Sequence, residues 1–248
     1  FTKNISEAAI DGARGNSGVL IAQYFVGFAE GCEKQEKLDG YTLGKAFEIG
    51  SKSAREAMED PKEGTILTVF QDLSDVINNS LNKGIDDIYE LMEIGYKTAL
   101  QSLKETPEKL KILKKAGVVD AGAQGFVDFL TGLMNFIKDG SLKNLDISSL
   151  NIEQKDQKTE GHHYNEEIDI NYRYCTECRI KGSHIDKKEL RTKLKKNGDS
   201  LIVAGSNNKI HVHIHSNEPA QVFSLCEKYG NVDGQKADDM FHQQELLN

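Results

Sequence analysis

Long apolar runs, a signal peptide and a regular cysteine framework are all missing from this sequence. No apolar segment approaches the roughly 18 consecutive residues of a membrane-spanning helix, and no secretion signal opens the chain. Only 4 of the 248 residues are cysteines, and their spacing is not that of a disulfide-stapled domain. These absences predict a cytoplasmic protein with reduced thiols and no membrane span.

A one-sided basic surface is missing as well. The 31 Lys and Arg residues are dispersed among 39 Asp and Glu residues, and the net charge is −8. Because a nucleic-acid partner requires a basic patch that neutralises phosphates, the sequence predicts no such partner. A hydrophobic content of 38% still allows a substantial core, and the length suits one large domain or two ordinary ones.

The most distinctive segment that is present is Gly12-Ala13-Arg14-Gly15-Asn16-Ser17-Gly18, which directly precedes an apolar run over residues 19–28. Glycines permit positive φ and close backbone approach to a ligand, and Asn16 or Ser17 can cap the helix that the apolar run predicts. Such a helix N-terminus offers free N–H groups and a positive dipole end to a phosphate. The segment is neither a Walker A loop nor a Rossmann fingerprint, and tight helix packing alone also explains such glycines.

Two further glycine-containing loops repeat this arrangement. Residues 62–65 precede an amphipathic run over 66–81, and Thr65 either caps that helix or reaches a ligand. Residues 118–125 precede an apolar helix predicted over 126–137. The other helices are expected over residues 5–10, 19–30, 43–58, 85–103 and 107–115, the last capped by Thr106 and beginning at Pro107. Three such loops predict that helix N-termini gather around a common ligand.

The three segments together resemble the ATP-binding domain of dihydroxyacetone kinases, and most closely its version in the bacterial fatty acid kinase ATP-binding subunit. They are the first loop, Glu63-Gly64-Thr65-Ile66-Leu67-Thr68-Val69 and Gly117-Val118-Val119-Asp120-Ala121-Gly122-Ala123-Gln124-Gly125. The resemblance covers about residues 1–140 and implies an all-α barrel of antiparallel helices that holds ATP at one end. It implies nucleotide contacts from Gly15, Asn16, Ser17, Gly18, Gly64, Thr65, Asp120 and Gly122. Arg14 either binds phosphate oxygens or ties its loop to a neighbouring acid.

One family feature is absent from the sequence. The family carries an Asp-rich loop upstream of the Gly-Ala-Arg-Gly segment, and its carboxylates hold the Mg²⁺ ions that bridge the ATP phosphates. The sequence begins Phe1-Thr2-Lys3-Asn4 without an initiator methionine, which favours a fragment over an inactive relative. Because phosphoryl transfer depends on metal neutralisation of charge, we expect this chain alone to bind nucleotide weakly and to be inactive as a kinase.

The composition changes after the predicted helical domain of residues 1–140. Residues 141–164 are polar, end near His162-His163 and read as a linker. Strands are predicted over 168–180, 200–204 and 209–215, helices over 187–196 and 221–229, and a polar tail after Gly230. The sequence therefore predicts a multidomain protein whose second unit, residues 165–248, is a small α/β (α+β) domain.

Cysteine and histidine residues gather in two of these strands. Alternation along residues 209–215 places His211, His213 and His215 on one face, and Cys175 on another strand would add a thiolate. Mixed Cys and His ligands suit Zn²⁺, although a polar, solvated strand face explains the histidines equally well. Cys178, three residues after Cys175, should point to the opposite face.

The resemblance to the fatty acid kinase protein favours the metal. Its middle domain binds zinc through a Cys in a Tyr-Cys-Thr-Glu segment and two His in a Val-His-x-His segment, which fall on Cys175, His213 and His215. His211 is an additional candidate, alongside water or Glu177, for a fourth ligand. We expect a structural or interface role for zinc, and we expect Cys32 and Cys226 to be ordinary buried thiols.

The resemblance implies a function for the whole protein. A fatty acid kinase of this type transfers the γ-phosphoryl group of ATP to the carboxylate of a fatty acid held by a separate carrier protein, and gives an acyl phosphate for phospholipid synthesis. A homodimer is the expected assembly, and carrier docking is in doubt because the family's C-terminal domain is not in this sequence. The alternatives are a kinase of the dihydroxyacetone type and a non-catalytic module for zinc binding and dimerisation.

Overall fold

The computed structural model of the protein describes residues 2–33, 35, 37–139 and 171–242. The predicted linker 141–164 with its His162-His163 pair, and the start of the strand predicted over 168–180, lie outside the described residues.

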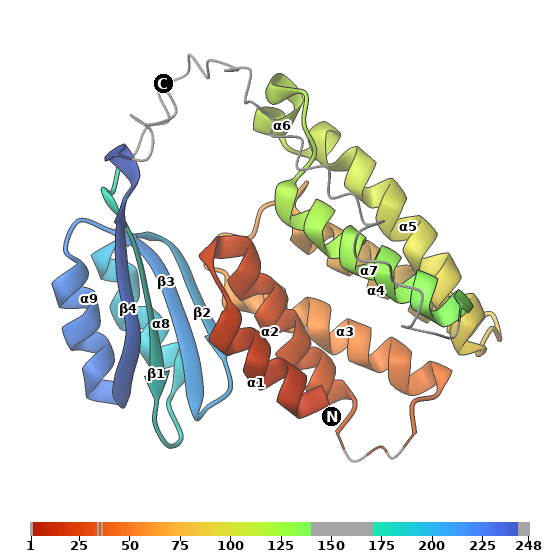
Figure 1. The fold of residues 1–248 in the computed structure, drawn as a ribbon, viewed down its shortest axis with the longest axis horizontal. Helices are drawn as coiled ribbons and strands as arrows, with labels where there is room; N and C mark the ends of the chain where they lie inside the picture. Colours follow the sequence, from red (N-terminus) through yellow and green to blue (C-terminus); the bar gives the residue numbers. More distant parts are fainter. Residues whose placement is uncertain (1, 34, 36, 140–170, 243–248) are drawn as a thin grey trace.

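Helices make up the first part of the chain. They are α1 (Thr2–Gly12), α2 (Gly15–Gly31), α3 (Gly40–Ala57), α4 (Ile66–Asn82), α5 (Ile88–Lys109), α6 (Lys111–Ala116) and α7 (Ala121–Asp139). Figure 1 shows them as a bundle on one side of the molecule, with a sheet on the other. The predicted order, a helical bundle followed by a small α/β unit, is confirmed.

Aromatic side chains fill the centre of the bundle. Tyr24 on α2, Phe70 on α4 and Phe126 on α7 are all at most 2% exposed. The rings of Tyr24 and Phe70 stack with centroids 4.1 Å apart, and Phe126 meets Phe70 edge-on at 4.7 Å. These contacts pack α2, α4 and α7 against one another.

The predicted helix break at Thr106 and Pro107 is wrong, because α5 continues to Lys109. A proline inside a helix removes the N–H that would bond the carbonyl four residues earlier, here that of Leu103. The hydroxyl of Thr106 donates to that carbonyl oxygen at 2.8 Å instead. The helix therefore tolerates Pro107 in its last turn, and α6 follows as a separate short helix.

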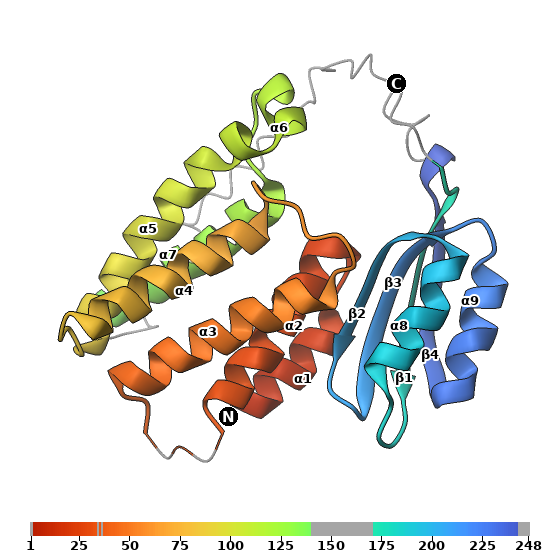
Figure 2. The ribbon, with the colours of Figure 1, turned by 180° about the vertical axis from the view of Figure 1, so that it is seen from behind.

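The second part of the chain is a four-stranded antiparallel sheet with two helices. Its elements are β1 (Tyr174–Lys181), α8 (Lys187–Leu194), β2 (Asp199–Gly205), β3 (Lys209–Ser216), α9 (Pro219–Cys226) and β4 (Asn231–Asp239). The strand order is β2-β3-β1-β4, and α8 and α9 lie side by side on one face (Figure 2).

The polar tail predicted after Gly230 is wrong, because residues 231–239 form β4 along β1. Most of this strand is polar and exposed or half-buried, so the alternation that marks a strand in sequence is missing. Polar edge strands of this kind are common because they discourage further pairing. The pairing shifts register between Glu177 and Arg179, and Gly234 opposite this irregularity has a φ of +60°.

The other face of the sheet packs against the helical bundle, as Figures 1 and 2 both show. Ile202 and Ala204 of β2 belong to the same apolar core as α2 and α3. An isolated bridge joins Met58 to Ile202, and the N–H of Glu59 donates to the Leu201 carbonyl oxygen at 3.2 Å. The two parts of the chain therefore share a hydrophobic interface.

Candidate functional site

Asp120 joins two of the three helix N-termini that the glycine loops predicted. Its Oδ1 accepts hydrogen bonds from the N–H of Ile66, at the start of α4, at 3.0 Å and from the N–H of Ala123, in the first turn of α7, at 2.8 Å. Ser17, in the first turn of α2, lies against Gly122 so closely that a Cβ at position 122 would clash with it. The N-terminal turns of α2, α4 and α7 therefore meet in one place, as predicted.

The predicted start of the last helix at residue 126 is wrong, because α7 begins at Ala121. The Asp120 carboxylate caps the helix there, so Gly122 and Gly125 lie in helical turns and not in a loop. Gly122 permits the close contact with Ser17 on α2.

The prediction that Asn16 or Ser17 caps α2 is also wrong. The helix begins at Gly15, and Arg14 in the cap position makes no side-chain capping bond. The N–H of Gly15, whose φ is +60°, donates instead to Glu177 Oε1 of β1 at 2.8 Å. A carboxylate distant in sequence thus takes the place of a local cap.

Two polar groups of the first loop have different surroundings. Asn16 Oδ1 is buried and has no hydrogen-bond partner among the described residues. Arg14 is exposed, and its Nη1 donates to the carbonyl oxygen of Ala13 at 2.6 Å. The guanidinium is therefore bonded within its own loop to a carbonyl and not to a neighbouring acid.

The second loop is shaped by Gly64 and Thr65. Gly64 has a φ of +77°, and a Cβ there would lie 2.7 Å from the Thr106 carbonyl oxygen, so only glycine fits. Thr65 Oγ1 accepts from the N–H of Leu67 at 3.3 Å and donates to the Lys62 carbonyl oxygen at 2.8 Å. The capping role of Thr65 is confirmed, and its contact with a ligand stays a prediction.

Cys175, His213 and His215 come together on the bundle-facing side of the sheet. Pairing of β1 with β3 sets Cys175 opposite His215 and Glu177 opposite His213. One ligand atom from each of the three residues lies within 4.8 Å of the other two, and Cys175 Sγ is 3.9 Å from His213 Nδ1. Soft sulfur with two imidazoles is a donor set suited to zinc.

Carboxylates orient both of these histidines. Glu177 Oε1 lies 2.9 Å from His213 Nδ1, and Asp199 Oδ1 of β2 lies 3.3 Å from His215 Nδ1. Carboxylates in this position hold the imidazoles of metal sites with Nε2 toward the ion. His213 Nε2 is buried and has no partner among the described residues, so the arrangement fits a metal ion.

The ionisation of the cluster follows from burial and from these contacts. Burial alone would raise the pKa of Glu177, but hydrogen bonds from His213 and the Gly15 N–H lower it to about 2. Burial and the carboxylates of Glu177 and Asp238 raise the pKa of the Cys175 thiol to about 11. Burial also lowers the pKa of His215. At neutral pH, Glu177 is therefore ionised, and a metal must displace the thiol proton from Cys175.

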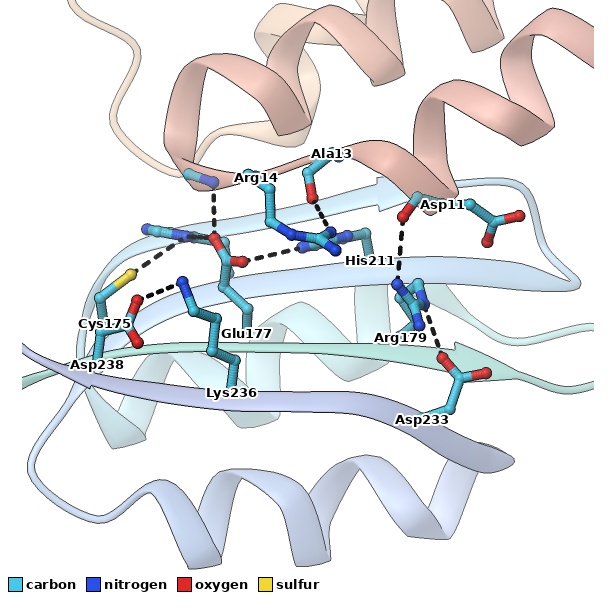
Figure 3. A network of polar contacts seen from close by, with 12 residues as sticks. Asp11, Ala13, Arg14, Cys175, Glu177, Arg179, His211, Asp233, Lys236 and Asp238 are labelled. Atoms are coloured by element: carbon cyan, nitrogen blue, oxygen red, sulfur yellow. Dashed lines mark hydrogen bonds and ion pairs between the residues drawn. The ribbon is translucent and has the colours of Figure 1, made fainter.

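His211, the additional candidate, lies outside the three-residue group among the described residues. Figure 3 shows Glu177 between Cys175 and His211. His211 Nε2 is 3.9 Å from Glu177 Oε2, on the side away from Cys175, and burial lowers the pKa of this imidazole.

The opposite orientations of Cys175 and Cys178 are confirmed. Cys178 is fully buried in the core between the sheet and its helices, together with Cys226 of α9. A hydrogen bond with Cys226, together with burial, raises the pKa of Cys178.

Sequence reasoning missed Asp199 and the bond between Glu177 and Gly15. Glu177 stood only as an alternative zinc ligand, and nothing in the sequence marked Asp199. Both contacts depend on strand register and on packing of the sheet against α2, which no local pattern encodes.

A separate apolar cavity of about 650 Å³ opens at the other end of the bundle. Phe25, Phe28, Phe47, Phe129 and Leu133 are among its lining residues, together with Cys32 at the C-terminal end of α2. Because the glycine loops lie at the N-terminal ends of α2, α4 and α7, this cavity is distinct from the loop cluster.

Two known protein families match this chain. The DAK2 domain matches residues 1–135, which is more than half of the sequence. The chain belongs to the DAK2 domain family. A second family, described as the middle domain of proteins like the A subunit of fatty acid kinase, matches residues 171–247 of this DAK2-family chain. Together the matches identify a kinase-family protein and confirm the resemblance found in the sequence.

Staphylococcal relatives match both parts. An uncharacterized protein of Staphylococcus haemolyticus (strain JCSC1435) is 34% identical over 249 residues, which covers 97% of this chain and 44% of that protein. An uncharacterized protein of Staphylococcus aureus (strain USA300) is 33% identical over 248 residues, with the same coverage. The chain thus spans less than half the length of these relatives.

None of the described helices is both long enough and apolar enough to cross a membrane.

Proposed function

We propose that this DAK2-family chain binds ATP at the cluster of helix N-termini formed by α2, α4 and α7. The supporting observation is the meeting of three helix starts through Asp120, Ser17 and Gly122. The positive dipole ends of three helices at one place favour a polyphosphate. Asn16 and Ser17, with Gly15 and Gly18, would contact phosphates, while Gly64, Thr65, Asp120 and Gly122 would shape the pocket.

The reaction of the whole protein is a further part of the proposal. We infer transfer of the γ-phosphoryl group of ATP to the carboxylate of a fatty acid held by a separate carrier protein, giving an acyl phosphate for phospholipid synthesis. The match to the middle domain of fatty acid kinase relatives favours this acceptor over dihydroxyacetone. A homodimer and a cytoplasmic setting belong to the same proposal.

Residues described near the loops do not form a Mg²⁺ site. Asp11 pairs with Lys209, Asp120 Oδ1 accepts two backbone N–H groups, and Glu63 accepts from Thr68 and Arg55. These carboxylates are engaged separately, whereas Mg²⁺ on ATP needs carboxylates that converge. Phosphoryl transfer is therefore assigned to the whole protein, and nucleotide binding to this chain.

We further propose that Cys175, His213 and His215 bind zinc in a structural role. Zinc would fix β1 and β3 on the sheet face that packs against α2, while Glu177 and Asp199 hold the two imidazoles. These three protein ligands would leave the fourth coordination position of the zinc to water or another group.

Calorimetric titration of the 248-residue chain with ATP, with and without Mg²⁺, tests the nucleotide site. Asn16→Ala should weaken binding by about fivefold or more, because it removes the side-chain NH₂ group that would donate to phosphate. Asn82→Ala makes the same change on an exposed residue at the C-terminal end of α4 and should leave the affinity unchanged. Equal affinities for both variants and the parent chain would refute the site.

Metal analysis tests the zinc site. The purified chain should hold one zinc per chain after dialysis against buffer, and Cys175→Ser should lose it, because a hydroxyl is a poor zinc ligand. Cys32→Ser, at the C-terminal end of α2, is the matched control and should retain the metal. Zinc retained by Cys175→Ser would contradict the assignment.

A further inference from the structure

Glu177 touches both proposed sites through a single oxygen atom. Its Oε1 accepts from the N–H of Gly15 at 2.8 Å and lies 2.9 Å from His213 Nδ1 (Figure 3). The residue is only 4% exposed, so water screens neither contact well. One carboxylate therefore lies between the N-terminal turn of α2 and the Cys and His cluster.

The hydrogen-bond donors define the roles of the groups. An ionised carboxylate only accepts, so the Nδ1 atom of His213 that faces Glu177 must be the donor. Nε2 is the atom that lacks a partner among the described residues, and it is the atom a metal would take. His213 thus links Glu177 to the metal position through one imidazole ring.

The charge at this point differs between the two metal states. Zn²⁺ bound by a Cys175 thiolate would bring two positive charges in exchange for one thiol proton, so it would add one positive charge beside His213 and Glu177. The nearby Lys236 and Asp238 form an ion pair with each other and add no net charge in either state.

We propose that Glu177 couples metal occupancy of the Cys175, His213 and His215 cluster to the anion affinity of the α2 N-terminus. Without metal, the Glu177 anion occupies the Gly15 N–H and repels a phosphate bound at Asn16 and Ser17. Zinc withdraws charge from Glu177 through His213, so it strengthens nucleotide binding, and nucleotide strengthens zinc binding by the same factor. The coupling rests on the proposed nucleotide and zinc sites, and Glu177 acts in it as a positioning residue.

Titration with ATP of the zinc-loaded and the chelator-stripped 248-residue chain measures the coupling. In the parent chain, zinc should tighten ATP binding about fivefold or more. Glu177→Gln keeps the shape and an accepting oxygen but removes the charge, so the stripped variant should bind ATP more tightly than the stripped parent, and zinc should add little. Glu218→Gln removes one charge from an exposed residue at the start of α9 and should behave like the parent.

A second readout needs neither nucleotide nor a variant. Zinc added to the ¹⁵N-labelled stripped chain should shift the amide resonance of Gly15, because its acceptor changes charge, and should leave that of Gly84, at the far end of α4, in place. If zinc binds and the Gly15 amide resonance does not shift, the coupling is refuted. It is also refuted if zinc changes the ATP affinity of Glu177→Gln as much as that of the parent chain. Loss of the proposed function gives a different result. A chain that binds no ATP in either metal state refutes the nucleotide site, and a chain that takes up no zinc refutes the metal site, each together with the coupling. ATP binding whose affinity is unchanged by bound zinc refutes the coupling alone.

Discussion

Single carboxylates organise the helix ends at which we place the nucleotide. Asp120 accepts N–H groups from α4 and α7, and Glu177 accepts the first N–H of α2. A negative charge at a helix N-terminus is favourable because it satisfies orphan donors and complements the dipole. Two carboxylate side chains thus position the N-terminal ends of three helices.

Replacement of Asp120 by Ala should lower the free energy of unfolding by about 2 kcal/mol, because two buried N–H groups lose their acceptor. Asp120→Asn keeps an acceptor and should cost about 1 kcal/mol or less. Urea denaturation followed by circular dichroism measures both changes.

Asp128→Ala is the control for this pair of variants. Asp128 lies on α7, the helix that Asp120 caps, and among the described residues it accepts only from exposed Gln124 at 2.8 Å. Its removal should cost no more than about 0.5 kcal/mol. Equal losses for Asp120→Ala and Asp128→Ala would show that Asp120 does not hold the two helix ends.

At the scale of elements, Thr106 explains how α5 passes through Pro107. Its hydroxyl donates to the Leu103 carbonyl oxygen at 2.8 Å and accepts from the Asp120 N–H at 3.1 Å. One buried side chain therefore satisfies the carbonyl that Pro107 leaves without a donor, and it connects the end of α5 to the start of α7. Local sequence predicts a break here because the low helix propensity of proline is visible, whereas the hydrogen bond from Thr106 that compensates for it is not.

Thr106→Val should destabilise the protein by about 2 kcal/mol, since it leaves a buried carbonyl and a buried N–H without their partner while keeping the volume. Thr106→Ser retains the hydroxyl and should cost less. Thermal unfolding of the two variants beside the parent chain compares them, and a Val variant as stable as the Ser variant would contradict this role.

At the scale of the whole molecule, the sheet and the bundle share a core. Gln23 of α2 is 4% exposed, accepts from the Gly205 N–H of β2 and donates to Ser53 of α3. Ile202, fully buried, lies in the core that the helices build. The bundle and the sheet are therefore joined by buried apolar and polar contacts, and not only by the chain that links them.

We therefore expect the bundle and the sheet to unfold in one cooperative transition. Ile202→Ala should lower the midpoint of that transition as a whole, with a loss of about 2–4 kcal/mol, because the cavity it leaves lies in the shared core. Calorimetry provides the measurement, with Val212→Ala, on the opposite face of the sheet, for comparison. Two separate transitions, or a loss confined to the sheet, would show that the parts fold independently.

The sequence by itself determined the class of each part, because helical and strand periods are local. It located the glycine loops, and alternation in one strand put His211, His213 and His215 on one face. It also assigned Cys175 and Cys178 to opposite faces. The sequence did not predict three features: the helix start at Ala121, the continuation of α5 through Pro107 and the polar strand β4. These depend on capping by Asp120, on the hydrogen bond from Thr106 and on pairing with β1, which the local pattern does not show.

Only the tertiary structure decided which groups meet. Strand register placed Cys175 opposite His215 and left His211 on the other side of Glu177. Packing of the sheet on α2 brought the Glu177 side chain into contact with Gly15, 162 residues away in sequence. Such contacts depend on how whole elements dock, and docking is determined by the summed burial of many side chains and not by any one segment.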